Sequence, residues 1–132
     1  MSADYPDDRL YHRDALWLKP LDNGEALIGV NHHAQKQLGK IMFVDLPRVG
    51  AEIRRDVALG TIESSKAVSD LIAPVSGQVL EVNARLRRAP DLVNQDPNGE
   101  AWLLRVRLAS HEEDRQRLHT AAAYLALMGL DT

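Results

Sequence analysis

The feature that most constrains this chain is the stretch from Gly60 to Gly77. It contains two runs of strand-forming residues, including Ile62 and Val68, on either side of the polar tetrad Glu63-Ser64-Ser65-Lys66. Small polar residues close tight turns, so this pattern predicts a β-hairpin. Lys66 is expected at the tip, with its side chain in solvent. We predict that this lysine is modified and carries the chemistry of the protein.

Further short strands are predicted on both sides of the hairpin. They are expected at residues 10–11, 16–18, 25–30, 41–46, 51–53, 57–63, 78–83 and 102–108. Turn signals separate these runs, and Asn23-Gly24 is the strongest of them. Many short strands with a turn every eight to twelve residues or so predict a mainly β domain, built as a small barrel or sandwich.

Helices are predicted at three places in this single domain of residues 1–132. Asn31 is a candidate N-cap for a helix over residues 32–38, which Gly39 ends. A one-turn helix is expected at 84–88, and a C-terminal helix over 111–128 has a capping box and an apolar stripe at helical spacing.

The ends and one connection are predicted to have no regular structure. Residues 1–9 are polar and acidic and are expected to form a loose N-terminus. Residues 91–100 are expected to form a loop. Within it, Asp96-Pro97-Asn98-Gly99 lacks the acidic ladder and the glutamate of a calcium site, so it is interpreted as a turn.

Composition excludes several functions. The chain has no cysteine, hence no disulfide, thiolate nucleophile or cysteine-type zinc site. Its net charge is −3, and its densest basic cluster, Arg85, Arg87 and Arg88, is too small for nucleic-acid binding. That cluster is expected to be a solvated face, or alternatively to dock an acidic partner. No apolar segment has the length of a signal or a membrane span, so we predict a cytoplasmic protein without membrane contact.

Neither the histidines nor the serines near the predicted site are expected to bind metal or to act as nucleophiles. His32 and His33 are adjacent in a predicted helix and therefore point to different sides, and no third ligand stands out, so no metal site is predicted. The hairpin serines, Ser64 among them, have no neighbouring base and are not predicted to be nucleophiles.

Two glycines bracket the hairpin lysine, Gly50 before it and Gly77 after it. This arrangement resembles lipoyl and biotinyl domains, in which two glycine-containing turns bracket a lysine at a hairpin tip. Biotinyl domains place methionine on both sides of that lysine. Here Lys66 stands between Ser65 and Ala67, so the site resembles a lipoyl acceptor.

The residue Glu63 strengthens this resemblance, because lipoyl acceptors have an acidic residue before the lysine that helps the ligase recognise the site. The resemblance therefore implies lipoate in amide linkage on Lys66, with Glu63, Ser65 and Ala67 as recognition residues for a lipoate ligase or lipoyl transferase.

Several motifs follow one another in the order seen in glycine cleavage system H proteins. They are Gly29-Val30-Asn31-His32-His33-Ala34-Gln35, Phe43-Val44-Asp45-Leu46-Pro47, Glu63-Ser64-Ser65-Lys66-Ala67, Ala73-Pro74-Val75-Ser76-Gly77, Val82-Asn83 and Leu92-Val93-Asn94. The resemblance runs from about residue 10 to the C-terminal helix. The fold it implies is a barrel-sandwich hybrid of the lipoyl-domain type: two antiparallel sheets with short helices and a C-terminal helix.

The function implied by this resemblance is that of a carrier, not an enzyme. The lipoylated arm swings between partners and delivers a tethered intermediate at high effective concentration. Implied partners are glycine decarboxylase, aminomethyltransferase and dihydrolipoamide dehydrogenase. We expect a monomer, because a shuttle must expose its tip to several partners.

One position departs from the family pattern. H proteins usually have His-Glu-Trp near the first strand, whereas this chain has Ala15-Leu16-Trp17. In the family that glutamate lies in the cleft where the loaded arm rests and pairs with the aminomethyl cation. Leu16 cannot do so, and His33 and Asp70 remain as cleft candidates. This favours slightly a specialised carrier in sulfur oxidation with a heterodisulfide-reductase-like complex. The alternatives are the aminomethyl carrier of glycine cleavage and a non-lipoylated structural paralogue.

Overall fold

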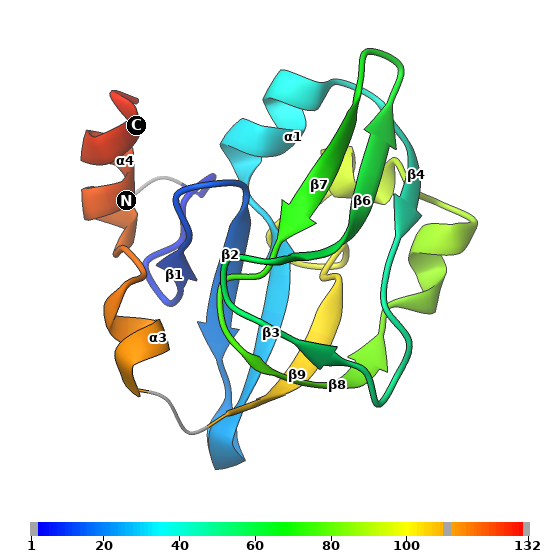
Figure 1. Cartoon of the computed structure of the whole chain (residues 1–132). Helices are drawn as coiled ribbons and strands as arrows, with labels where there is room; N and C mark the ends of the chain where they lie inside the picture. The colour runs from blue at the N-terminus through cyan, green and yellow to red at the C-terminus, as the bar shows by residue number, and fades with distance from the viewer. Residues whose placement is uncertain (1–2, 110–111, 131–132) are drawn as a thin grey trace.

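The computed structural model describes residues 3–109 and 112–130, and within them nine strands form two antiparallel sheets (Figure 1). The strands are β1 (Leu10–Tyr11), β2 (Leu16–Pro20), β3 (Glu25–Val30), β4 (Ile41–Asp45), β5 (Glu52–Ile53), β6 (Ala58–Ser64), β7 (Val68–Ile72), β8 (Gly77–Val82) and β9 (Leu104–Leu108). The larger sheet has the order β1-β2-β3-β9-β8-β5, and the smaller has the order β4-β6-β7. The prediction of a mainly β fold with two antiparallel sheets is confirmed.

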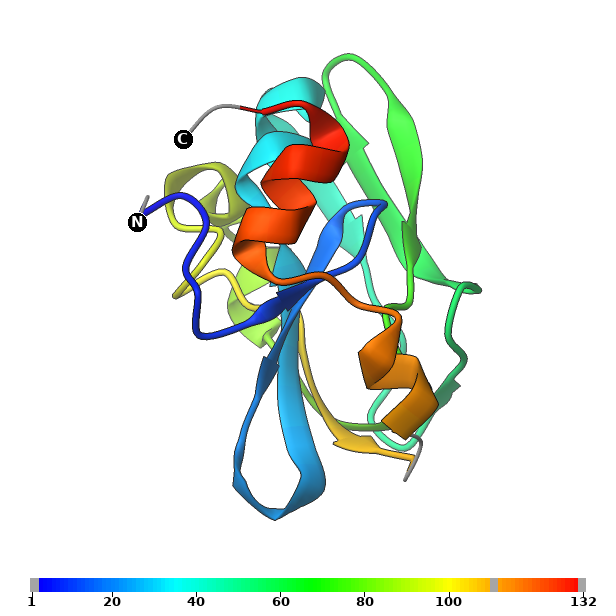
Figure 2. The same ribbon diagram turned by 90° about the vertical axis from the view of Figure 1, so that its left-hand side faces the viewer.

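The helices lie around these sheets and are short. They are η1 (Asp22–Gly24), α1 (His32–Leu38), η2 (Ala84–Arg87), α2 (Leu92–Gln95), α3 (Glu112–Gln116) and α4 (Ala121–Met128). Figure 2 shows α3 and α4 on one side of the molecule, next to β1 and β2. In both views α1 lies beside the hairpin of β6 and β7 (Figures 1 and 2).

Helix α1 has the boundaries that its sequence predicts. The side-chain oxygen of Asn31 accepts a hydrogen bond from the backbone N–H of Ala34 at 2.8 Å, which satisfies one of the free donors of the first turn. At the other end, Gly39 has a φ of 78°, a conformation that costs glycine little, and its N–H donates to the carbonyl of Gln35. The chain therefore turns sharply from α1 into β4.

The C-terminal segment is not one helix, so the prediction for 111–128 is wrong. Helix α3 ends at Gln116, and Thr120 starts α4 as an N-cap that accepts a hydrogen bond from Ala123 N–H at 3.2 Å. Between the two helices, His119 pairs with Tyr11 through two backbone hydrogen bonds of 2.7 and 2.8 Å. This pairing and the Thr120 cap replace helical hydrogen bonds that are lost where the helix is interrupted. Residue 110, part of the expected capping box, lies outside the described residues.

The N-terminal segment is packed rather than loose over its described part. Tyr5 is only 5% exposed, and its ring centroid lies 6.2 Å from those of Tyr11 and Tyr124. The rings of Tyr11 and Tyr124 stack at 5.4 Å. These aromatic rings form a second apolar cluster that joins the N-terminal segment to α4.

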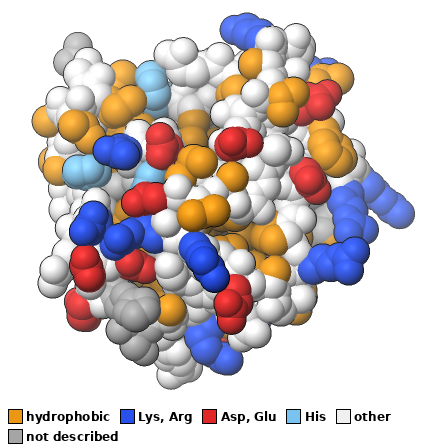
Figure 3. All heavy atoms as spheres, in the orientation of Figure 1, with side chains coloured by type: hydrophobic (Ala, Val, Ile, Leu, Met, Phe, Trp, Pro, Cys, Tyr) orange, Lys and Arg blue, Asp and Glu red, His pale blue; other side chains and the backbone are white. Residues whose placement is uncertain are grey.

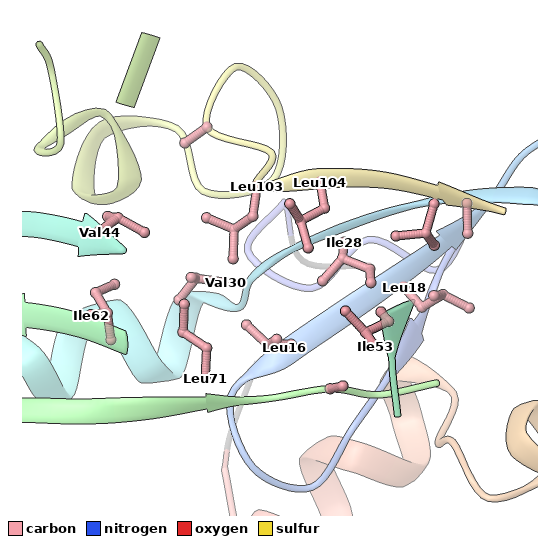
Figure 4. Packing of buried hydrophobic residues seen from close by; sticks show 14 of the residues in the cluster. Leu16, Leu18, Ile28, Val30, Val44, Ile53, Ile62, Leu71, Leu103 and Leu104 are labelled. Atoms are coloured by element: carbon pink, nitrogen blue, oxygen red, sulfur yellow. The ribbon is translucent and has the colours of Figure 1, made fainter. Parts of the chain in front are cut away.

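The main core lies between the two sheets (Figure 4). Leu16 and Ile28 from the larger sheet and Ile62 and Leu71 from the smaller sheet each expose 2% or less of their surface. The prediction that residues 91–100 form only a loop is wrong, because they contain the short helix α2, whose Val93 is buried in this core. Both strands of the Lys66 hairpin are therefore anchored in the core.

Candidate functional site

The connection between β6 and β7 consists of residues 65–67 and is closed by a serine. The Ser64 Oγ accepts hydrogen bonds from the backbone N–H groups of Lys66 at 3.1 Å and of Ala67 at 3.2 Å. The Ser64 N–H donates to the carbonyl of Ala67 at 2.8 Å. Serine hydroxyls stabilise tight turns in this way. The predicted hairpin with Lys66 at its tip is confirmed, and Ser64, 7% exposed, fixes its shape.

The tip also rests against the corner between α1 and β4. The N–H of Ser65 donates to the carbonyl of Lys40 at 3.3 Å. The aliphatic part of Lys66 passes Gly39, where an added Cβ would lie 3.4 Å from the Lys66 Cε. Lys66 is exposed, and within the described residues it takes part in no ion pair. Its amine is therefore accessible for acylation, as attachment of lipoate requires.

The corner itself is braced by Asn94, which follows Val93 in α2. Its side-chain amide donates to the carbonyl of Gly39 at 2.7 Å and to Gln35 Oε1 at 3.1 Å, and its oxygen accepts from Ile41 N–H at 2.9 Å. These three bonds connect α2, α1 and β4. They hold in place the corner on which the tip rests.

The outer face of the smaller sheet carries exposed apolar and acidic side chains next to Lys66. Phe43, Glu63 and Val68 are cross-strand neighbours on β4, β6 and β7. Phe43 and Val68 are 55% and 65% exposed. Two residues further along the strands, and so on the same face, lie Asp45 and Asp70. Figure 3 shows hydrophobic and acidic side chains side by side at its upper right, over this sheet.

The three residues predicted to help ligase recognition all lie at the surface. Glu63 is exposed at the end of β6, and Ser65 and Ala67 flank Lys66 in the connection. Each could be reached by an enzyme that approaches the tip.

The predicted resting cleft is only partly supported by the geometry. Asp70 is exposed on β7, and His33 is partly buried in the first turn of α1, beside the hairpin. The two form no hydrogen bond or ion pair with each other in the part of the chain that the structure describes. Leu16 is 0% exposed and belongs to the main core, so its assignment to an open cleft is wrong.

Two residues of the site were missed by sequence reasoning. The sequence predicts Ser64 only as one of four polar residues at the turn and does not identify it as the one whose hydroxyl holds the turn closed. The sequence shows Asn94 only as part of a family motif, because hydrogen bonds from α2 to α1 and β4 join residues that are far apart in the chain and leave no local signal. Over residues 3–109 and 112–130, no cluster of three His, Asp or Glu side chains could hold a metal ion, and no helix could cross a membrane.

Two packed sheets with an accessible lysine at the tip of a fixed hairpin define a carrier domain of the lipoyl type. Comparison with known proteins agrees: the family model described as "Glycine cleavage H-protein" matches residues 9–129. A "Glycine cleavage system H protein" of Rubrobacter xylanophilus is 50% identical over 112 residues, which cover 85% of this chain and 87% of the relative. A "Probable glycine cleavage system H protein" of Natronomonas pharaonis is 48% identical over 126 residues, 96% of this chain and 98% of the relative.

A solved structure agrees as well. The crystal structure of a glycine cleavage system H protein from Mycobacterium marinum matches with a TM-score of 0.85 and 37% identity, over 95% of this chain and 99% of that one. The chain belongs to the glycine cleavage H-protein family.

Proposed function

We propose that this protein carries lipoate in amide linkage on Lys66 and serves as the aminomethyl carrier of the glycine cleavage system. The observation that carries the proposal is the exposed lysine on a hairpin tip that Ser64 closes and the α1–β4 corner supports. Membership in the H-protein family supports the same function. The protein acts as a tethered substrate of its partners.

The residues of the tip present the lysine and do no chemistry themselves. Lipoate, when bound, supplies a dithiolane whose two sulfurs provide the redox and group-transfer chemistry that a chain without cysteine lacks. Amide formation removes the positive charge of Lys66. Because Ser64 and Lys40 hold the backbone on both sides of Lys66, the arm leaves the protein from one fixed point.

The outer face of the smaller sheet is the surface that we expect partners to recognise. Phe43 and Val68 offer exposed apolar area, and three carboxylates, Asp45, Glu63 and Asp70, lie among them. A partner with an apolar contact surrounded by basic residues would complement this face. Four enzymes have to reach Lys66, and each is therefore expected to contact this face. They are the lipoyl-attaching enzyme, glycine decarboxylase, aminomethyltransferase and dihydrolipoamide dehydrogenase.

The names of the relatives and the position of Leu16 both support an aminomethyl group as the cargo. The slight preference for sulfur oxidation depended on Leu16 replacing a cleft glutamate. Leu16 is buried in the core, so it gives no information about what a surface cleft binds. The relatives described above are named as glycine cleavage proteins, and the sulfur alternative gains no support from them. The aminomethyl carrier is therefore preferred.

The first experiment measures modification. Purified protein incubated with a lipoate ligase, ATP and lipoate should gain the mass of one lipoyl group in intact mass spectrometry. Lys66→Arg keeps the positive charge but cannot form the amide, so it should gain nothing. Lys40→Arg, a change at the exposed neighbour of the tip, is the matched control and should be modified like the wild type. Equal modification of Lys66→Arg and wild type would overturn the proposed site.

The second experiment separates the three functions. The lipoylated protein is mixed with glycine decarboxylase, aminomethyltransferase, dihydrolipoamide dehydrogenase, tetrahydrofolate as the one-carbon acceptor and NAD⁺, and glycine-dependent NADH formation is measured. The proposal predicts activity that is absent for Lys66→Arg. A lipoylated protein that fails here would contradict the glycine cleavage function, and a protein that no ligase modifies would indicate a structural paralogue.

A further inference from the structure

A hollow rich in arginine lies near the ends of β6 and β7 that are far from the hairpin tip, where Asp56 precedes β6 and Pro74 follows β7. It has a volume of about 260 Å³ and forms where three segments meet: the β1–β2 loop, the β5–β6 turn and the link between α3 and α4. Its charged and titratable lining residues are His12, Arg13, Arg55, Asp56, Arg117 and His119. Figure 3 shows Lys, Arg and His side chains on the left, over the region of β1 and α3, with acidic side chains among them.

The lining carries more positive than negative charge, with three arginines and one carboxylate. Arg55 pairs with Asp114 at 2.8 Å, and Arg117 forms only a solvent-exposed pair with Glu113 at 3.1 Å. Such exposed pairs contribute little and are readily exchanged. Arg13 takes part in no ion pair among the described residues. Two of the three guanidinium groups are therefore available to a ligand.

His12 lines the hollow, and its side chain is only 8% exposed. Its Nδ1 accepts a hydrogen bond from the Asp14 N–H at 3.1 Å, which leaves Nε2 as the donor to Asp56 Oδ1 at 2.7 Å. The pKa of Asp56 is lowered, first by this hydrogen bond from His12 and further by the positive charges of Arg55 and Arg13. The carboxylate is thus already occupied, and it faces a positive field.

We propose that this hollow binds a phosphate dianion, either inorganic phosphate or the phosphoryl group of a small metabolite. Its volume of about 260 Å³ is below the roughly 300–1,000 Å³ typical of sites for drug-sized ligands, so it suits a small ion. All three cations are arginines. A planar guanidinium group can donate two parallel hydrogen bonds to two oxygens of one phosphate. The site is separate from the Lys66 arm and does not depend on its modification.

A bound dianion would connect the three segments that form the hollow. Arg13 precedes β2, and Arg117 and His119 belong to the link that pairs with Tyr11. Neutralising their mutual repulsion would stabilise the position of the C-terminal helices against the larger sheet. Phosphate binding should therefore raise the thermal stability of the native protein by mass action.

The test is a titration of the full-length protein with sodium phosphate at constant ionic strength, followed by isothermal calorimetry and by amide chemical shifts. We expect saturable binding, with shifts centred on Arg13, Asp56 and His119. The double variant Arg13→Gln/Arg117→Gln should bind about tenfold more weakly or worse. Arg87→Gln/Arg88→Gln, which removes two exposed arginines of the η2 region, is the matched control and should bind as the wild type does.

A second titration with glycerol 3-phosphate distinguishes the two sources of the dianion. Tighter binding than phosphate, with the same shifts, assigns the site to a phosphorylated metabolite, and weaker binding assigns it to phosphate itself. The proposal is overturned if phosphate gives no saturable binding, if the shifts lie elsewhere on the wild-type protein, or if the Arg13→Gln/Arg117→Gln variant binds phosphate as tightly as the wild type.

Discussion

Replacement of Ser64 by alanine tests the claim that one hydroxyl shapes the tip. The substitution removes the acceptor of the Lys66 and Ala67 N–H groups and leaves the β6–β7 register unchanged. Alanine fits the space of serine, so no steric conflict is expected. The backbone bond from Ser64 N–H to Ala67 is also kept. The hydroxyl's own hydrogen bond to the Ala67 carbonyl, at 3.3 Å, is lost as well, so the change is confined to the bonds that close the tip.

The magnitude follows from the bonds that are lost. A neutral hydrogen bond contributes about 0.5–1.5 kcal/mol net, and a difference of about 1.4 kcal/mol is tenfold in an equilibrium constant. Because the Lys66 and Ala67 amides become free to bond to water, each should open more easily by about 1 kcal/mol. Their hydrogen exchange should accelerate about fivefold, while exchange in the buried part of β7 stays as in the wild type.

The assay is native-state hydrogen exchange by NMR on unmodified protein, with Ser65→Ala as the control. Ser65 is exposed, and its hydroxyl forms no hydrogen bond with the described residues, so exchange at Lys66 and Ala67 should not change in that variant. Equal exchange rates for Lys66 and Ala67 in Ser64→Ala and wild type would refute the role of the hydroxyl. Lipoylation of Ser64→Ala should also be slower than that of the wild type, since the ligase then meets a less ordered tip.

Four further substitutions, at three positions, test the core and the β5–β6 turn. Leu16→Glu should lower the free energy of unfolding in urea by about 3–5 kcal/mol, because it places an unpaired carboxylate in the core, whereas Leu16→Met should cost less than about 1.5 kcal/mol. Gly29→Ala should cost about 1–3 kcal/mol in the same assay, because its Cβ would lie 2.2 Å from the ring of Trp17; an unchanged urea midpoint would contradict this. Asparagine tolerates the φ of 67° at position 56 as aspartate does, so Asp56→Asn removes only the negative charge of the carboxylate that is hydrogen-bonded to His12. Since the pKa of Asp56 is lowered from 3.8 in the native state, the wild-type advantage over this variant should be present above pH 3.8 and be lost as the pH falls through the lowered value; an advantage independent of pH would refute it.

The parts of the fold that the sequence predicts well are those set by local interactions. The α1 helix is bounded by an Asn31 cap and a Gly39 stop, both of which act within one turn of chain. The Lys66 hairpin likewise depends on two adjacent runs and the polar residues between them. In such cases the residues that determine the structure are neighbours in the sequence.

The C-terminal segment shows why other predictions fail. The apolar spacing of Leu118, Ala121 and Leu125 continues through the break between α3 and α4, so periodicity alone indicates one helix. The break depends on backbone pairing of His119 with Tyr11, which lies at the opposite end of the chain. No sequence pattern near residue 119 predicts its pairing with Tyr11.

The site was predictable to a similar extent. The position of Lys66 follows from local pattern, but the three hairpin residues Ser64, Ser65 and Lys66 do not reveal which serine turns inward. Strand register decides this, since Ser64 is the last residue of β6 and is buried while Ser65 is exposed. Leu16 is the converse case: its apolar character was interpreted as a changed surface cleft, whereas its register places it in the core.

The bonds that fix the hairpin tip have a consequence for the speed of a carrier. Because the backbone around Lys66 is held by Ser64 and Lys40, the motion of an attached arm is that of an exposed side chain, on the picosecond-to-nanosecond scale. A typical enzyme turns over about ten times per second, so the arm samples its whole range many times within one catalytic cycle. The slow physical step in transfer between partners is then the separation of one protein from the carrier and the arrival of the next.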